Sequence, residues 1–253
     1  MDEAFEIFDY LPIEDIEVNG YTKPLYNSAI VTYEKEEYQF SYFAMHLIFM
    51  SFIYSTVWKI GQFHKEKYED SLLFARPYNG SNVDFKEISS VFEYSHLPEK
   101  DIFEFFALID IDNGYIKSIK RLIDFRNEMA HATGTFQISS DDHFSDALRE
   151  LLSVSSNIQE KMNTTIRSWY REVLINYAKN GLSENYATPA DFITEVFINN
   201  LSFSKKDLQV CKDFGLNKLK DWKESGLSKE EIARVVEFHK SVKEQYDNLF
   251  GDE

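Results

Sequence analysis

The chain has 253 residues, of which 43% are hydrophobic, so it can bury a core and wholesale disorder is excluded. Only 9 Gly and 5 Pro interrupt it, which favours long helices over many short strands. The formal net charge of −16 repels nucleic acid on average, so any contact with RNA needs a local basic patch.

The cysteine content and the start of the chain bear on its compartment. The single thiol, that of Cys211, excludes an internal disulfide and a zinc site made of cysteines, and it is typical of a reducing compartment. Residues 1–4 are acidic and lack the basic residues and apolar run of a signal peptide. We therefore expect a cytoplasmic protein.

The first predicted elements are a lead-in and a long helix. Residues 1–33 are aromatic and acidic, with Pro12, Gly20 and Pro24 as interruptions, and residues 29–33 suggest a short extended piece. A helix is predicted over residues 34–63.

Residues 40–58 of this helix contain no Asp, Glu, Lys or Arg, which meets the length rule for a membrane span. Small and polar side chains nevertheless recur along the helix at steps of three and four, at Glu37, Ser41, Ala44, Ser51, Ser55, Lys59 and Gln62. A helix with one narrow polar seam is typical of the centre of a bundle, so we prefer that interpretation and expect no membrane contact. His46 lies off the seam and is expected to be a hydrogen-bonded core histidine.

Shorter helices are predicted next, over residues 64–75, 84–94 and 99–109, with a turn at residues 78–82. A further helix follows from about Asn113 to His131, and Gly134 suits its exit. Asp110 and Asp112 stand just before it. Paired carboxylates can bind a cation, but a role in starting the helix is the preferred reading.

The rest of the chain carries repeated helix-start signals. Residues 139–142 open a long helix that reaches Lys179, and Gly181 closes it. Cap patterns then begin at Thr188, Ser204 and Ser228. We expect three parts: a lead-in over residues 1–33, a helical domain over 34–180 and a C-terminal helical module over 181–253. Residues 216–240 could form a helix-turn-helix, but their charge balance is poor for DNA.

The helix that ends at His131 carries the candidate chemistry. At 100° per residue, its apolar side chains gather on one side, and Arg126 projects within that apolar sector. A buried guanidinium needs a partner. Either Arg126 makes a structural ion pair with a carboxylate from another helix, or part of the sector lines a cleft in which Arg126 meets an anion.

His131 favours the cleft. It follows Asn127 by four residues at the C-terminal end of the helix, where the dipole favours a protonated ring. A histidine can exchange a proton near neutral pH, and an arginine can hold a phosphate and stabilise the charge of its transition state. RNA supplies its own nucleophile, the 2′-hydroxyl, so such cleavage needs no metal.

Arg126, Asn127 and His131 form the pattern R-N-x-x-x-H, which resembles the signature of the HEPN superfamily. The resemblance covers roughly residues 35–180, although only the motif is specific. It implies an all-α, HEPN-like helical bundle, to which this chain adds a small C-terminal bundle. It also implies a homodimer in which two motif helices form a composite cleft, and often a metal-independent endoribonuclease of toxin–antitoxin, abortive-infection or CRISPR defence systems.

The resemblance assigns roles to residues. His131 is the expected general acid or base, Arg126 the phosphate binder and Asn127 the residue that orients them or touches substrate. The expected products are 2′,3′-cyclic phosphate and 5′-hydroxyl ends. Thr133 stands where relatives silenced by nucleotide transfer carry a tyrosine, so that control is not expected here.

Four basic side chains, Lys117, Lys120, Arg121 and Arg126, make the local patch that an acidic nuclease needs, although a solvated helix face explains them equally well. Of these, Lys117 and Lys120 are the candidate substrate-binding lysines. The histidines are too widely spaced for a metal site, and the sequence has no phosphate loop or dinucleotide fingerprint, so neither metal nor cofactor is expected. The expected partners are RNA, a second copy of the chain and an antitoxin or other defence protein. The rival hypotheses are a HEPN-like adaptor without catalysis and a helical membrane-associated protein.

Overall fold

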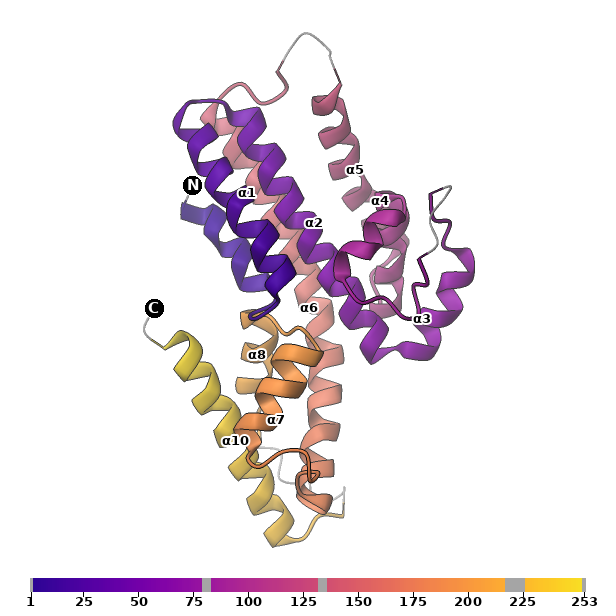
Figure 1. The fold of residues 1–253 in the computed structure, drawn as a ribbon, viewed down its shortest axis with the longest axis vertical. Coiled ribbons are helices and arrows are strands. Elements are labelled where there is room, and N and C mark those ends of the chain that lie inside the picture. Colours follow the sequence, from indigo (N-terminus) through magenta and orange to yellow (C-terminus); the bar gives the residue numbers. More distant parts are fainter. Residues whose placement is uncertain (1, 79–82, 132–135, 217–225, 252–253) are drawn as a thin grey trace. The chain divides into compact units, whose positions relative to one another are not determined.

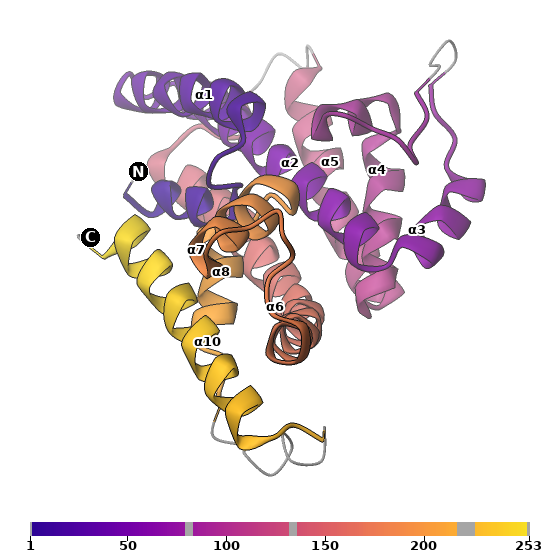
Figure 2. The ribbon, with the colours of Figure 1, turned by 60° about the horizontal axis from the view of Figure 1, so that its bottom comes forward.

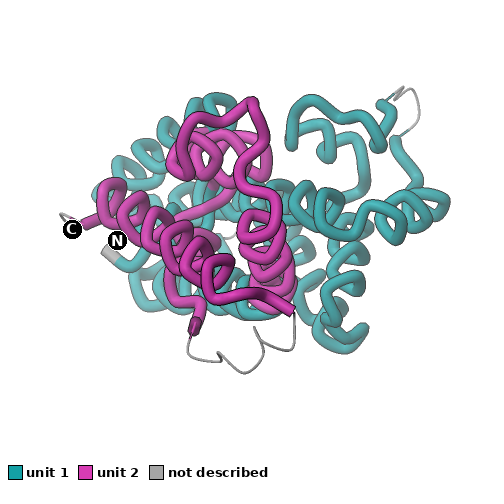
Figure 3. Tube along the Cα trace, turned by 90° about the horizontal axis from the view of Figure 1, so that it is seen from below, with its two compact units in different colours: residues 1–11, 15–161 teal, residues 12–14, 162–253 magenta. Residues whose placement is uncertain are grey.

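The computed structural model describes residues 2–78, 83–131, 136–216 and 226–251. These residues form helices and no strand, which confirms the predicted all-α class. They fall into two compact units, which Figure 3 colours separately: unit 1 comprises residues 1–11 and 15–161, and unit 2 comprises residues 12–14 and 162–253. The division falls inside one long helix, whereas the sequence suggested a boundary near Gly181.

The elements of unit 1 are marked in Figure 1. They are η1 (Asp2–Tyr10), α1 (Ile16–Glu34), α2 (Tyr38–Phe63), α3 (Lys65–Ser71), η2 (Leu72–Phe74), η3 (Val91–His96), α4 (Glu99–Ile102), η4 (Phe103–Ile109), α5 (Asn113–Ala130) and the first part of α6 (Asp141–Asn180).

The lead-in is helical, so the prediction of an extended piece at residues 29–33 is wrong. Helix α1 begins where the Asp15 carboxylate accepts a hydrogen bond of 2.9 Å from the Val18 N–H, and it continues through Pro24. Its buried side, which includes Val18 and Ala29, lies along α2, and the Ser41 hydroxyl donates to the Ala29 carbonyl at 2.8 Å. Burying the Val18 side chain gains about 1.5–3 kcal/mol, which offsets part of the roughly 3 kcal/mol that a proline costs inside a helix.

Helix α2 is the core helix of unit 1 and begins at Tyr38 rather than near Glu34. It is the one helix among the described residues whose length and composition would allow it to cross a membrane, and 83% of its apolar window is buried within the protein. The seam residues Ser41, Ser51, Ser55 and Lys59 are all buried. The prediction of a central bundle helix is therefore confirmed.

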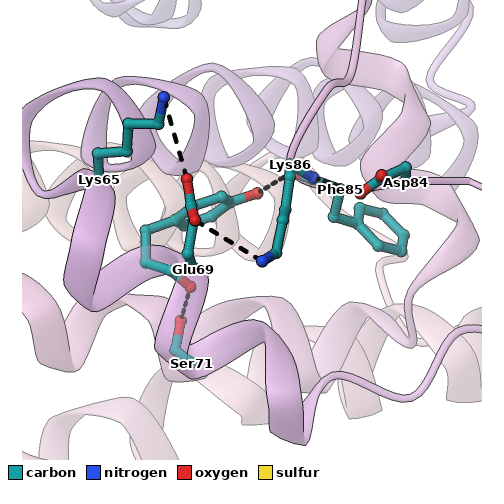
Figure 4. Close-up of polar contacts among 7 residues, drawn as sticks. Lys65, Glu69, Ser71, Asp84, Phe85 and Lys86 are labelled. Atoms are coloured by element: carbon teal, nitrogen blue, oxygen red, sulfur yellow. Dashed lines mark hydrogen bonds and ion pairs between the residues drawn. The ribbon is translucent and has the colours of Figure 1, made fainter.

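The segment before α4 is less helical than predicted. Residues 84–90 form turns, and the helical part starts only at Val91, because the Ser90 side chain and Glu93 make a capping box there. Figure 4 shows how α3 holds this segment: Glu69 lies between Lys65 (4.0 Å) and Lys86 (3.6 Å). The adjacent Tyr68 hydroxyl donates to the Phe85 carbonyl at 3.0 Å.

Unit 2 combines the second part of α6 with α7 (Pro189–Phe192), the π-helix η5 (Ile193–Asn200), α8 (Lys205–Lys212) and α10 (Lys229–Phe250). The three predicted caps are confirmed, since Thr188, Ser204 and Ser228 each form a capping box. Its core is aromatic and contains the rings of Trp169, Tyr170, Phe197, Phe203 and Phe238.

Three sequence features fall at least partly outside the described residues. Thr133 and Gly134, and the first part of the possible helix-turn-helix at residues 217–225, lie there. Residues 79–82 of the predicted turn lie there as well.

Candidate functional site

Helix α5 presents the motif at its C-terminal end. Asp112 starts the helix by accepting a hydrogen bond of 3.0 Å from the Tyr115 N–H, which confirms its role as a cap. The predicted apolar side is buried at Ile116, Ile119, Leu122, Ile123 and Met129, which places that side against the core. His131 is the first residue beyond the helix, with extended backbone angles of φ −83° and ψ 146°.

Arg126 makes the ion pair that its apolar surroundings require. Its Nη2 donates to Oε2 of Glu99, the first residue of α4, and the two side chains are 17% and 25% exposed. The guanidinium carbon also lies 6.0 Å from the centre of the Phe43 ring on α2. The first explanation of the buried arginine, a carboxylate from another helix, is therefore confirmed.

Arg126 is also among the residues that line an open hollow of about 430 Å³. The wall comes from α2, from Tyr78, from residues 95–100 and from α5. Both ribbon views show α4 beside α5 (Figures 1 and 2). Its polar lining consists of Tyr54, Tyr78, Ser95, Glu99, Lys100, Arg126 and Asn127. Arg126 thus both pairs with a carboxylate and lines the hollow.

His131 lies outside this hollow. Its side chain is exposed at the end of α5 and is not among the residues lining the wall. Within one chain, the structure brings together Arg126 and Asn127 and leaves His131 apart from them.

The two predicted lysines do not line the hollow either. Lys120 forms an ion pair with Glu104, and Lys117 is exposed. The lysine that does line it is Lys100, which pairs with Asp124 across α4 and α5.

Sequence reasoning missed Glu99 and Lys100. The signal for a carboxylate was present, because an arginine in an apolar stripe demands one. Which of the 43 Asp and Glu residues becomes the partner of Arg126 depends on which helix packs beside α5, and only the tertiary structure shows that.

Some buried polar atoms of α2 and of Arg126 have no hydrogen-bond partner. Among the described residues, the buried side-chain nitrogen and oxygen atoms in this condition are the Tyr42 hydroxyl, both ring nitrogens of His46 and the Arg126 Nε. Leaving such a group unpaired costs about 1–3 kcal/mol. The prediction that His46 is hydrogen-bonded is therefore wrong for this structure, although its burial is confirmed.

Burial sets the protonation of this group. It lowers the pKa of His46 to about 3, with a further contribution from the positive charge of Arg126, so the ring is neutral near pH 7. Burial also raises the pKa of Tyr42 above its usual range, and the charge of Glu150 adds to this. The phenol therefore keeps its proton. Both side chains are uncharged hydrogen-bonding groups.

The described residues contain no group of three His, Cys, Asp or Glu side chains that could hold a metal ion. Scans against models of known families, curated proteins and solved structures find no match to this chain.

Proposed function

We propose that the chain is a cytoplasmic, metal-independent endoribonuclease of the HEPN type, which acts as a toxin or effector in a bacterial defence system. The observation that carries the proposal is the placement of Arg126. Its side chain is mostly enclosed by protein and binds the carboxylate of Glu99, and both residues line the same open hollow. A guanidinium held in this way suits a phosphodiester.

The proposed reaction uses the 2′-hydroxyl of RNA as the nucleophile. The 2′-hydroxyl loses its proton as its oxygen attacks the adjacent phosphorus, the bond from phosphorus to the 5′-oxygen breaks, and the leaving 5′-oxygen takes up a proton. Arg126 stabilises the charge that develops on the phosphate, and His131 accepts the first of these protons or delivers the second. Asn127, which lines the same hollow, orients the substrate. The products are a 2′,3′-cyclic phosphate and a 5′-hydroxyl.

The site is completed by a second copy of the chain. Because His131 of one chain stands outside the hollow that holds Arg126, the two groups need a partner molecule to share a substrate. The surface near the end of α5 suits such a contact. Phe40 and Phe136 are 55% and 61% exposed, with ring centres 6.1 Å apart. Gln39, the residue before Phe40, donates to the Met129 carbonyl and accepts from the Gln137 N–H.

A second function, that of a binding module without catalysis, is favoured by the Arg126–Glu99 pair. A guanidinium neutralised within its own chain explains the motif arginine as part of the scaffold. The two functions differ in one respect: only the enzyme depends on His131.

The test is RNA cleavage in the presence of EDTA by the full chain, beside His131→Ala. Cleavage by the wild type is expected to persist with the chelator and to fall at least about 100-fold in the variant, as for loss of a general acid or base. The products should carry cyclic phosphate by mass spectrometry.

The control for this test is His143→Ala, which removes another exposed histidine, on α6, and should cleave like the wild type. Equal cleavage by the wild type and His131→Ala would refute the mechanism. RNA binding without cleavage by any of the three proteins would support the binding module.

A further inference from the structure

The hollow that Arg126 lines carries a local positive charge. Two of the three charged side chains in its lining, Arg126 and Lys100, are cations, and Glu99 is the third, in a chain whose formal net charge is −16. The hollow beside η2 has the opposite balance, with two carboxylates against one guanidinium. The first hollow therefore suits a phosphate group, and the second does not.

Both cations of this hollow can turn to a phosphate. Lys100 pairs with Asp124, and because both side chains are about half-exposed, this pair adds little to stability. Arg126 donates to Glu99 through Nη2, and a guanidinium has further N–H groups with which a phosphate can bond. A phosphate in the hollow thus has two cations along the wall.

The same hollow offers an exposed aromatic ring. Tyr78 is 56% exposed, whereas Tyr54, the other aromatic residue in the lining, is 7% exposed and its ring lies edge-on to that of Phe92. The Tyr78 N–H donates to the His96 carbonyl at 2.9 Å, which holds the Tyr78 backbone beside residues 95–100, a part of the wall. Tyr54 thus belongs to the packed interior, while the Tyr78 ring still has surface for a flat partner.

Cationic side chains beside an exposed aromatic ring are the groups with which proteins bind single-stranded nucleic acid. The cations bind the phosphate, and a base stacks on the ring. A base inside a duplex cannot stack in this way, because its neighbours already cover both of its faces. The volume of about 430 Å³ lies within the range of small-ligand sites, about 300–1,000 Å³, and suits a single nucleotide.

We propose that Tyr78 is a substrate-binding residue of this site: an unpaired RNA base stacks on its ring while the attached phosphate binds Arg126 and Lys100. The hollow then selects single-stranded RNA, such as a loop or an unpaired end, over duplex RNA. This selectivity rests on the proposed function, because it names the form of RNA that the same site takes. Binding needs neither His131 nor cleavage, so stacking and catalysis can be tested separately.

The first test measures binding to the full chain by fluorescence anisotropy at fixed salt. The probe is a labelled oligoribonucleotide whose 2′-hydroxyls are all methylated, so that it cannot be cleaved. The wild type should bind the single strand at least about tenfold more tightly than the same strand in a duplex, as for one stacked base. Tyr78→Leu removes the ring and should weaken single-strand binding by about tenfold, whereas Tyr78→Phe keeps the ring and should bind like the wild type.

The matched control is Phe74→Leu, which removes a highly exposed ring from the hollow beside η2 and should bind the strand like the wild type. Circular dichroism checks that each variant is folded, which is expected because both rings are at the surface. Equal losses in Phe74→Leu and Tyr78→Leu would overturn the proposal. Equal affinity of the wild type for strand and duplex, or no binding of the strand, would overturn it as well.

A scan with abasic strands distinguishes stacking from a structural effect of the substitution. Removing one base at a time should lower the affinity of the wild type by about tenfold at one position. At that position Tyr78→Leu should lose nothing further, because the ring and the base form one interaction. If the losses from the missing base and the missing ring add at every position, no base stacks on Tyr78 and the proposal fails.

RNA cleavage separates the stacking site from the proposed nuclease. In Tyr78→Leu, KM for single-stranded RNA should rise by about tenfold with little change in kcat, as for a lost binding interaction. Single-strand binding that depends on the Tyr78 ring, in a protein that cleaves no RNA, would support the stacking site and refute the nuclease. Cleavage with a KM that is the same in wild type and Tyr78→Leu would support the nuclease and refute the stacking site.

Discussion

Arg126 is the central residue of the proposed site. Its Nη2 donates to the Glu99 carboxylate, while its Nε is buried and has no hydrogen-bond partner. The carboxylate stabilises the fold and competes with any phosphate for the same charge. These two effects have opposite consequences for stability and for RNA binding, so one substitution separates them.

Glu99→Gln is expected to lower the free energy of unfolding by about 1–3 kcal/mol, because it removes the ionic partner of a largely enclosed guanidinium. It should also raise affinity for RNA by roughly three- to tenfold, because the phosphate no longer competes with a carboxylate. Urea unfolding and a fluorescence binding assay at fixed salt measure the two changes.

Glu104→Gln is the control for that prediction, because it makes the same change in net charge at a more exposed pair, with Lys120. It should cost less than about 1 kcal/mol and change RNA affinity little. If both variants bind RNA equally, the effect is one of net charge and Glu99 does not compete at the site.

At the scale of the element, α5 owes its start to a local cap and its orientation to burial. Asp112→Ala should lower the free energy of unfolding by about 1 kcal/mol, since the Tyr115 N–H loses its acceptor. The matched variant Asp112→Asn keeps an acceptor and should stay within a few tenths of a kcal/mol of the wild type. Chemical denaturation measures the free energy of unfolding of both variants. If both lose the same amount, the negative charge of Asp112 stabilises the protein and its hydrogen bond to the Tyr115 N–H does not.

The contrast between α1 and α5 shows what decides an element. In α5 the cap lies where the helix begins and the apolar side is the side that is buried, so the bounds predicted from sequence nearly match those observed. In α1 the local signals of Gly20 and Pro24 point away from a helix, and the packing of its whole buried side along α2 outweighs them.

At the scale of the whole molecule, the proposal requires a dimer. The double variant Phe40→Ser/Phe136→Ser should weaken self-association by about 30-fold or more, as expected when a central aromatic pair is lost from an interface. Cleavage should fall with it, while each chain remains folded. Analytical ultracentrifugation over a range of concentrations measures the change.

Phe74→Ser is the control for the interface, since Phe74 is a highly exposed aromatic residue elsewhere, in η2. It should leave both association and cleavage unchanged. A wild-type chain that stays monomeric at all concentrations yet cleaves RNA would exclude the composite site.

The sequence by itself determined the all-α class, the helix that carries Arg126 and ends just before His131, the burial of α2 and the three helix caps in the C-terminal part. These features depend on residues within a few positions of one another, so spacing and capping chemistry are enough to predict them. The tertiary structure alone decided that Glu99 binds Arg126, that Lys100 rather than Lys117 or Lys120 lines the hollow, and that the ring nitrogens of His46 lack partners. Those outcomes depend on which distant side chains share a space, because a buried charge or polar group takes its partner from whatever the packing of other helices brings beside it.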